Sequence, residues 1–304
     1  ELLSCAYAKM LEIPCANYRA CRLGNEWGVL TQKIQKESEN LVLGCEIIQR
    51  FFNEYPYKKE EFLSIFANPV FLSSYEIPES FLKEKEKQKI LLSYLNNLDH
   101  IWSIFSVLKS DNEKSLIIFF TKMLLFEILT LQADCNVNNW GVIEKDGKFF
   151  PAKLFDQMTS FGLGYYDMEK RANNFRNEQM NARFLRNEEP LKAYVYQGYP
   201  LFTLTNQNVQ NFITGKKDSH LKVLADFLEM SSEEYQELFF QYFEKINEIS
   251  FSDVVAQVEK ENGLTMDDDV YAYISSVFNF HIKNIKQEIE KKKEGNLYVE
   301  RRSL

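Results

Sequence analysis

The residues Ala133-Asp134-Cys135-Asn136-Val137-Asn138-Asn139-Trp140-Gly141-Val142-Ile143 decide the fold class of this chain. They follow an apolar segment, Leu116 to Leu131, which is shorter than the roughly 20 residues of a membrane span and is interrupted by Lys122 and Glu127. That segment predicts a buried helix. The polar residues 134–139 then predict a loop, and Trp140 to Ile143 predict a strand.

A second strand and a further acidic residue follow this loop. Residues 149–155 predict a strand that pairs with 140–143 around the turn Lys145-Asp146-Gly147 and leads to Asp156. A loop fixed at the end of a buried helix and followed by a tight hairpin brings its polar groups to one cleft. We therefore expect Asp134, Asn139 and Asp156 to lie close together.

The spacing of Asp134 and Asn139 matches the Asp-to-Asn spacing of a kinase catalytic loop. In phosphoryl transfer, one carboxylate accepts the proton of the substrate hydroxyl, while a carboxamide and a second carboxylate hold Mg²⁺ against the nucleotide phosphates. The pattern D-x-x-x-x-N also occurs by chance. The alternative interpretation makes Asp134 and Asp156 turn residues and Asn139 a cap.

The rest of the chain is predicted to be mainly helical. A first helix covers residues 1–12 and ends before Pro14, and a hairpin follows with strands at 17–23 and 28–34 around Gly24-Asn25-Glu26. The apolar periodicity predicts further helices at 39–54, 58–66, 86–108, 115–132, 218–229, 232–248, 252–262 and 268–292. Ser231 with Glu234 has the capping-box pattern, and Gly263 is placed to end a helix.

The composition indicates a globular protein, because 45% of the 304 residues are hydrophobic and 26% are charged. The net charge of −8 argues against a dedicated nucleic-acid binder. The five cysteines form no C-x-x-C pair, and their odd number suits reduced thiols in a cytoplasm. No secretory signal is visible at the start. We therefore expect a cytoplasmic protein without a membrane span.

Three segments of the chain resemble the HipA-like kinase family. The run from Ala133 to Ile143 is similar to that family's Asp-x-His-x-x-Asn-Trp/Phe-Gly motif, and Pro151 to Gly162 is similar to its segment around the metal-binding Asp. Residues 1–14, ELLSCAYAKMLEIP, resemble its N-terminal helix, and residues 28–34 resemble its strand leading into the hinge. The segments occur in the family's order.

This resemblance implies an α+β, protein-kinase-like (HipA-like) fold. Residues 1–35 would be the remnant of a truncated N-terminal lobe, and 36–304 a large, mostly helical C-terminal lobe with the catalytic loop and metal-binding hairpin at 133–163. Carried over residue by residue, the resemblance makes Asp134 the catalytic base, Asn139 and Asp156 the metal ligands, Glu1 the partner of a phosphate-binding lysine, and Gln32, Lys33 and Ile34 the adenine end of the cleft.

The implied activity is Mg²⁺-dependent transfer of the ATP γ-phosphate to Ser or Thr of a protein, in a bacterial toxin–antitoxin setting. Asn136 stands where the family commonly has His, and the sequence contains no glycine-rich phosphate loop with its lysine. We therefore expect transfer by this chain alone to be impaired. The missing parts would lie upstream of Glu1 or come from a partner, and an antitoxin-like partner is also expected.

Three other functions fit the same residues. The chain could be a catalytically inactive kinase-like module that binds a partner protein, a kinase of lipids or small alcohols, or a helical protein with an accidental motif. The histidines His100, His220 and His281 are far apart in the sequence and are predicted to have no catalytic or metal-binding role. The arginines at 171, 176, 183 and 186 are interpreted as solvated charges, with an anion-binding regulatory loop as the alternative.

Overall fold

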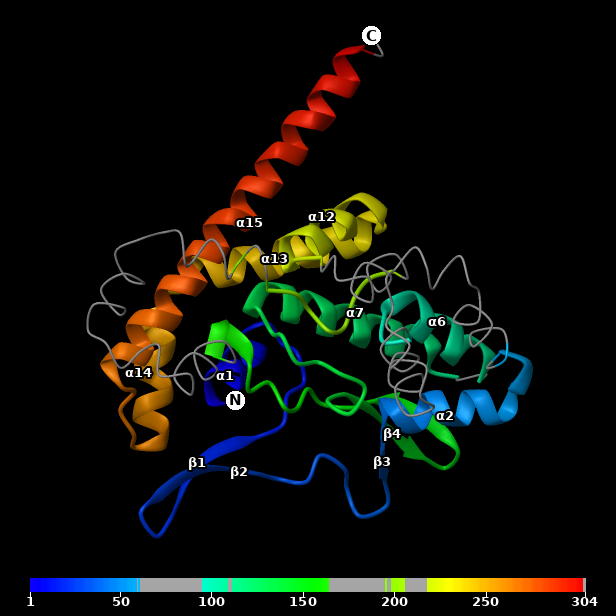
Figure 1. The fold of residues 1–304 in the computed structure, drawn as a ribbon, viewed down its shortest axis with the longest axis horizontal. Helices are drawn as coiled ribbons and strands as arrows, with labels where there is room; N and C mark the ends of the chain where they lie inside the picture. Colours follow the sequence, from blue (N-terminus) through cyan, green and yellow to red (C-terminus); the bar gives the residue numbers. More distant parts are fainter. Residues whose placement is uncertain are drawn as a thin grey trace, which may run out of the picture.

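The computed structural model describes residues 1–58, 60, 95–108, 111–163, 195, 198–205 and 218–302. Its elements form two small antiparallel sheets and a larger helical body (Figure 1). The helices are α1 (Leu2–Met10), α2 (Gly44–Glu54), α6 (Leu98–Val107), α7 (Glu113–Thr130), α12 (His220–Met230), α13 (Glu233–Glu248), α14 (Phe251–Asn262) and α15 (Asp268–Arg302), and η2 (Ser160–Gly162) is a 3₁₀ turn. The strands are β1 (Tyr18–Leu23), β2 (Glu26–Thr31), β3 (Asn40–Leu43), β4 (Gly141–Lys145) and β5 (Lys148–Pro151).

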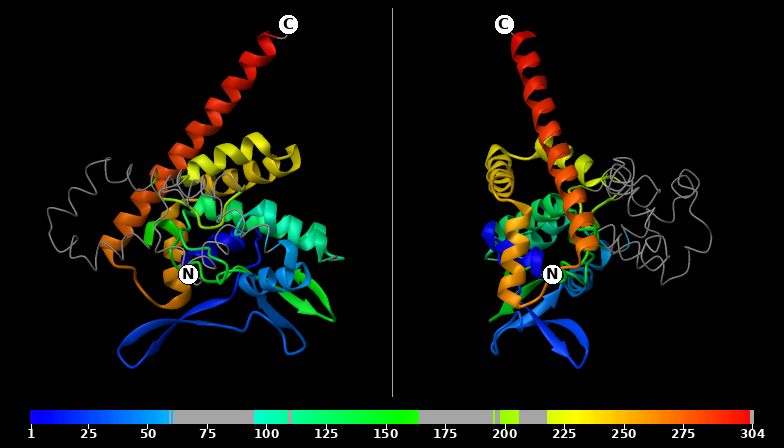
Figure 2. Two further views of the ribbon diagram at one scale, coloured as in Figure 1. Left: turned by 45° about the vertical axis from the view of Figure 1, so that its right-hand side comes forward. Right: turned by 90° about the vertical axis from the view of Figure 1, so that its left-hand side faces the viewer.

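The N-terminal helix and hairpin form as predicted, but the second strand covers 26–31 rather than 28–34. Strands β1 and β2 pair antiparallel up to Leu23 and Glu26, so the turn needs only Gly24, whose φ of 63° suits glycine, and Asn25. The hairpin points away from the helical body in both Figures 1 and 2. The contacts that anchor it include the hydrogen bond from the amide of Ala20 to Oδ1 of Asn262 in α14, at 2.9 Å.

The second sheet has the order β3-β4-β5, and its first strand corrects a prediction. Residues 40–43 were expected to begin a helix over 39–54, but they pair with β4, and α2 begins only at Gly44. The predicted second strand of the hairpin ends at Pro151 rather than 155. Leu154 instead forms an isolated parallel bridge with Cys15, which connects the N-terminal segment to the stretch just before Asp156.

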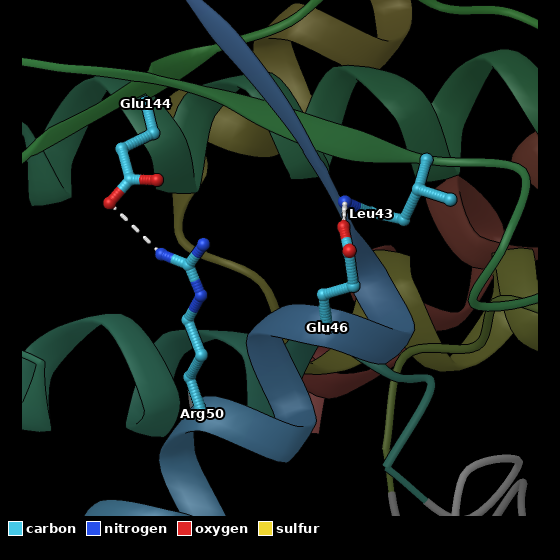
Figure 3. Close-up of polar contacts among 4 residues, drawn as sticks. All are labelled: Leu43, Glu46, Arg50 and Glu144. Carbon is cyan, nitrogen blue, oxygen red and sulfur yellow. Dashed lines mark hydrogen bonds and ion pairs between the residues drawn. The ribbon is translucent and has the colours of Figure 1, made fainter.

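Polar contacts hold α2 against this sheet (Figure 3). The Glu46 carboxylate accepts a hydrogen bond from the amide of Leu43 at 2.8 Å, at the point where β3 becomes α2. One turn later, Nη1 of Arg50 lies 2.9 Å from Oε1 of Glu144 in β4. The Arg50–Glu144 pair is partly exposed, so it contributes at most about 1 kcal/mol. These contacts therefore orient α2 relative to the sheet but add little to the stability of the fold.

Helix α7 lies at the centre of the body. Twelve of its 18 residues are buried, including Phe120, Leu124 and Phe126 at 0% exposure. Helices α6, α12 and α13 and strand β5 all contact it. The sequence prediction of a buried helix is confirmed, and none of the helices in the described part of the chain is long and apolar enough to cross a membrane.

An aromatic cluster packs the N-terminal helix onto the C-terminal helices. The ring of Tyr7 in α1 lies 5.2 Å from that of Phe161 in η2 and 5.4 Å from that of Phe278 in α15. Phe251 of α14 completes the cluster, 5.1 Å from Phe278. Such ring pairs add to the burial of large apolar side chains. Elements from both ends of the chain thereby enclose the segment that follows Asp156.

Helices α12, α13 and α14 agree with the predicted ranges within two residues, and Gly263 ends α14 with a left-handed φ of 61°. Helix α15 corrects a prediction, because it continues to Arg302 rather than ending at 292. The expected Ser231–Glu234 capping box is wrong, because the N-cap of α13 is Ser232, which makes no side-chain capping bond. Within the predicted helix at 86–108, the described part is helical only from Leu98. The four arginines of 164–194 and most of the helix predicted at 58–66 lie outside the described residues.

The contact between Gly44 and Trp140 leads to a first prediction. A Cβ on Gly44 would lie 2.4–2.6 Å from the Trp140 ring, which cannot easily move because its Nε1 donates to Asn96 at 2.7 Å. We expect Gly44→Ala to lower the free energy of unfolding by about 1–3 kcal/mol, as overpacking does. Urea denaturation measures the change.

The matched control is Gly28→Ala in β2, where the nearest atom to an added Cβ is the sulfur of Cys21 at 3.7 Å. We expect that substitution to change the free energy of unfolding by less than about 1 kcal/mol. Equal losses of stability in the two variants would mean that the contact with Trp140 is not what excludes a Cβ at Gly44.

Candidate active site at the end of helix α7

The candidate site begins where α7 ends. Leu131, its C-cap residue, is fully buried and has a left-handed φ of 56°, which is unusual for a leucine. Its amide and that of Gln132 both donate to the carbonyl of Glu127. This tight ending turns the chain out of the helix and directly into the loop that starts at Gln132.

Hydrogen bonds within the loop hold Asp134 in place. Nδ2 of Asn136 donates to Oδ1 of Asp134 at 2.9 Å, and Nδ2 of Asn139 donates to the Asp134 carbonyl at 2.6 Å. Asn138 donates its amide to Oδ1 of Asn136 at 2.9 Å. Asn136 therefore supplies the hydrogen bond that a histidine could have made at its position. The second Asp134 oxygen and Oδ1 of Asn139 have no hydrogen bond among the described residues.

Asp156 lies across from this loop. Its φ of 55° is left-handed, a conformation that Asp tolerates better than most residues. Its amide donates to the Tyr18 hydroxyl at 3.0 Å, and its carbonyl accepts from Nε2 of Gln132 at 3.0 Å. Burial, and then the charge of Asp134, raise the pKa of the Asp156 carboxyl. Asp134 and Asp156 thus lie within electrostatic range of each other.

Glu1 lies within electrostatic range of this pair. Burial raises the pKa of its carboxyl, and the charge of Asp156 adds to that rise. The fold therefore places Glu1 beside Asp156 although 155 positions separate them in the sequence. The charge of Asp156 thus acts on Glu1, and that of Asp134 acts on Asp156, so a cation bound beside Asp156 would relieve repulsion in both pairs.

The oxygen ligands present suit magnesium. Asn139 offers a carboxamide oxygen and Asp156 a carboxylate, and Mg²⁺ binds through one or two such groups while nucleotide phosphates and water complete its octahedron. Within the described ranges, no cluster of three or more His, Cys, Asp or Glu side chains is placed to hold a metal by itself. The ligand set thus fits a metal that arrives together with a nucleotide.

A pocket of about 430 Å³ lies between the segment after β2 and the β4–β5 hairpin. Two of the three residues predicted for the adenine end, Lys33 and Ile34, line it. The third, Gln32, does not line it, and its exposed side chain accepts a 3.4 Å hydrogen bond from Asn17. The remaining lining residues are Gln35, Lys36, Glu39, Ile143, Lys145, Phe150, Pro151, Ala152 and Lys153.

This pocket is basic in an otherwise acidic chain. Four lysines and one glutamate line it, and no ion pair within the described residues engages these lysines. Ile143 and Phe150 provide an apolar wall. Its volume lies in the range of small-ligand sites.

Gln132 and Tyr18 were missed by the sequence reasoning. Gln132 is fully buried, and its side chain joins Asp156 to Thr159, whose hydroxyl donates to Oε1 of Gln132. The only signal was its position two residues before Asp134. Tyr18 lies 138 positions from Asp156, its hydrogen-bond partner, and no local pattern marks it.

The fold can be compared with solved structures. The proinflammatory kinase CtkA of Helicobacter pylori matches 96% of this chain and 86% of its own length, at 14% identity and a TM-score of 0.59. This chain has a kinase fold.

The sequence-based expectation of an α+β, kinase-like fold is thereby confirmed. A second structure, the HipA toxin of Shewanella oneidensis MR-1 in complex with HipB and operator DNA, matches 94% of this chain but 55% of its own, at 12% identity and a TM-score of 0.49. No protein-family model and no curated protein sequence matches. The roles of individual residues in this kinase fold stay predictions.

The hydrogen bond from Asn139 to Asp134 leads to a second prediction. Asn139 is 8% exposed, and Asn139→Ala leaves the Asp134 carbonyl without its donor. We expect the free energy of unfolding to fall by about 1–3 kcal/mol, the usual effect of a lost buried hydrogen bond. Urea denaturation provides the measurement.

Asn138→Ala is the control, because it removes the same atoms from the neighbouring exposed residue. We expect that variant to stay within about 0.5 kcal/mol of the parent. A loss of the same size in both variants would show that the Asn139 carboxamide does not hold the loop.

Proposed function

We propose that this chain is the core of a HipA-like kinase, which binds ATP with Mg²⁺ and transfers the γ-phosphate to a Ser or Thr hydroxyl of a protein. The observation that carries the proposal is the convergence of Asp134, Asn139 and Asp156 at the end of α7 in a kinase fold. The fold alone fits many functions, so the argument rests on these three side chains.

Each side chain has a role that matches its surroundings. Asp134 accepts the proton of the acceptor hydroxyl through the oxygen that Asn136 leaves open. Asn139 and Asp156 provide the oxygens for the metal, and the Asn139 carboxamide is oriented by the bond from its Nδ2 to Asp134. When bound, Mg²⁺ would neutralise charge on the nucleotide phosphates. The protein supplies the positioning that this reaction needs.

The basic pocket would hold the other end of the nucleotide. Ile34, Ile143 and Phe150 offer apolar contacts for a purine ring, and the surrounding lysines favour a polyanion. Lys153 of this pocket stands three residues before Asp156 in the chain. In this proposal, Gln32 has no contact with the base, which revises the predicted adenine end.

Glu1 would pair with a phosphate-binding lysine, and in this proposal a partner protein can supply that lysine. None of the residues placed around Glu1 by its electrostatic contacts is a lysine. An antitoxin-like partner, or a partner that contributes strands and a lysine beside Glu1, is therefore part of the proposal. A cytoplasmic location is also proposed, from the free cysteines of the described residues.

The metal role of Asp156 yields a third prediction. We expect the parent chain to bind a non-hydrolysable ATP analogue more tightly with Mg²⁺ than without it. In Asp156→Asn this enhancement should fall at least about tenfold, since a metal ligand loses its charge. Titration calorimetry of both proteins, with and without Mg²⁺, gives the comparison.

Asp146→Asn is a closely matched control. Asp146 has a φ of 52°, close to the 55° of Asp156, and lies exposed in the β4–β5 turn. The same substitution in the same backbone conformation should leave binding unchanged. Metal-dependent binding that survives in Asp156→Asn, or an equal loss in Asp146→Asn, would contradict the assigned role.

The role of Asp134 yields a fourth prediction. With γ-labelled ATP, we expect label on Ser or Thr of protein, and we expect Asp134→Asn to lower the transfer rate by about 10²–10⁴-fold with little change in nucleotide affinity. Label on phosphoinositide vesicles and none on protein would make the chain a lipid kinase. Nucleotide or partner binding without any transfer would favour a catalytically inactive module.

A further inference from the structure

Two buried histidines meet the end of α7. Nε2 of His220, at the start of α12, lies 2.8 Å from the carbonyl of Gln132, and Nε2 of His281, in α15, lies 2.7 Å from the carbonyl of Ile128. Both side chains have 0% exposure, and their rings are 6.4 Å apart in an edge-to-face arrangement. Elements far away in the sequence thus contact the last turn of α7 and the first residue of the loop.

The histidines act as neutral donors. Burial lowers the pKa of His220 to about 4 and that of His281 to about 3, so both rings are uncharged at neutral pH. A neutral imidazole carries one N–H, and for His281 it belongs on Nε2, the nitrogen with a carbonyl partner. Nδ1 of His220 also lies 3.2 Å from the Gly198 carbonyl, but the shorter contact to Gln132 favours the proton on Nε2.

The carbonyl groups that they contact have few other hydrogen-bond donors available. The last carbonyls of a helix have no partner within the helix, and here the helix end is buried away from water. The Ile128 carbonyl belongs to this set, and the Gln132 carbonyl follows at the start of the loop. The two N–H groups therefore satisfy acceptors whose burial would otherwise be unfavourable.

Gln132 connects His220 to Asp156, the candidate metal ligand, by hydrogen bonds. Its backbone carbonyl accepts from His220, while its side-chain Nε2 donates to the Asp156 carbonyl at 3.0 Å. Its Oε1 accepts from Thr159, which in turn accepts from the amide of Ala133 at 3.3 Å. A continuous hydrogen-bonded path thus leads from α12 through Gln132 to both sides of the cleft.

We propose that His220 and His281 are positioning residues of the candidate site, which fix the end of α7 and, through Gln132, the relative placement of Asp134 and Asp156. This inference deepens the proposed function and rests on it for its catalytic meaning. In this proposal neither histidine touches the reacting groups, so the inference gives them no catalytic or metal-binding role.

The experiment compares three substitutions at His220. His220→Gln can keep an N–H donor at the position of Nε2, whereas His220→Asn moves the donor to the position of Nδ1, and His220→Leu removes it. Hydrogen–deuterium exchange of the amides in 131–140 and 154–160 reports the placement of the loop. The Mg²⁺-dependent affinity for a non-hydrolysable ATP analogue reports the site.

We expect His220→Leu and His220→Asn to speed amide exchange in these two segments about tenfold and to weaken the Mg²⁺-dependent affinity by a similar factor. His220→Gln should stay within about threefold of the parent in both measurements. At position 281 we likewise expect faster amide exchange in His281→Leu than in His281→Gln. The effect on 154–160 should be smaller than for His220, because His281 does not contact Gln132. Since Asn and Gln are both polar and of similar size, their comparison remains decisive if the leucine variant does not fold.

Val255→Ala is the control for general destabilisation. Val255 is a buried residue of α14, and its truncation lowers stability without removing a hydrogen bond of the loop. Increased exchange confined to 131–140 and 154–160 supports the proposal. Equal effects of His220→Gln and His220→Asn, or the same local exchange in Val255→Ala, would overturn it and make the histidines ordinary core residues.

The exchange measurement also separates two kinds of failure. If the parent chain binds no nucleotide under any condition, the proposed function fails, but exchange in the His220 variants still tests whether the histidine holds the loop. If the parent binds nucleotide with Mg²⁺ and none of the variants changes either measurement, the proposed function stands and the positioning role fails.

Discussion

The burial of the end of α7 is the constraint on which the rest of the site depends. A helix that ends inside a protein must find donors there for its last carbonyls. In this chain the donors come from α12 and α15 through His220 and His281. The loop that begins at Gln132 is consequently fixed by the helical body, and the β4–β5 hairpin only completes the cleft.

Unusual backbone conformations gather at the same place. Leu131, Asp156 and Phe161 all have φ between 55° and 58°. Leu131 ends α7, and Phe161 lies within η2. Such conformations cost of order 1–3 kcal/mol each for residues other than glycine. Phe161 keeps its conformation because its ring is packed among Tyr7, Phe251 and Phe278. Stable packing elsewhere thus maintains a local geometry that the isolated segment would not adopt.

Local patterns could be predicted from the sequence, and contacts between distant residues could not. The loop, the β4–β5 turn and α7 follow from spacing, turn residues and an apolar run, all within about 40 positions. Strand β3 was taken for helix because Leu41 and Leu43 form a strand only through pairing with β4, about 100 positions away. Similarly, His220 offered no signal, since its partner Gln132 lies 88 positions before it.

Charges of one sign gather at two places in this structure. The charge of Asp134 raises the pKa of Asp156, and four lysines line the pocket beside the β4–β5 hairpin. Like charges therefore repel one another at each of these places. A polyanion carrying a divalent cation has the complementary arrangement, with positive charge beside the carboxylates and negative charge near the lysines. Since such a ligand relieves both repulsions at once, its binding would stabilise the folded chain in proportion to its affinity. Without it, neutral amides hold the two aspartates in place. Asn136 donates to the Asp134 carboxylate, Asn139 to the Asp134 carbonyl and Gln132 to the Asp156 carbonyl.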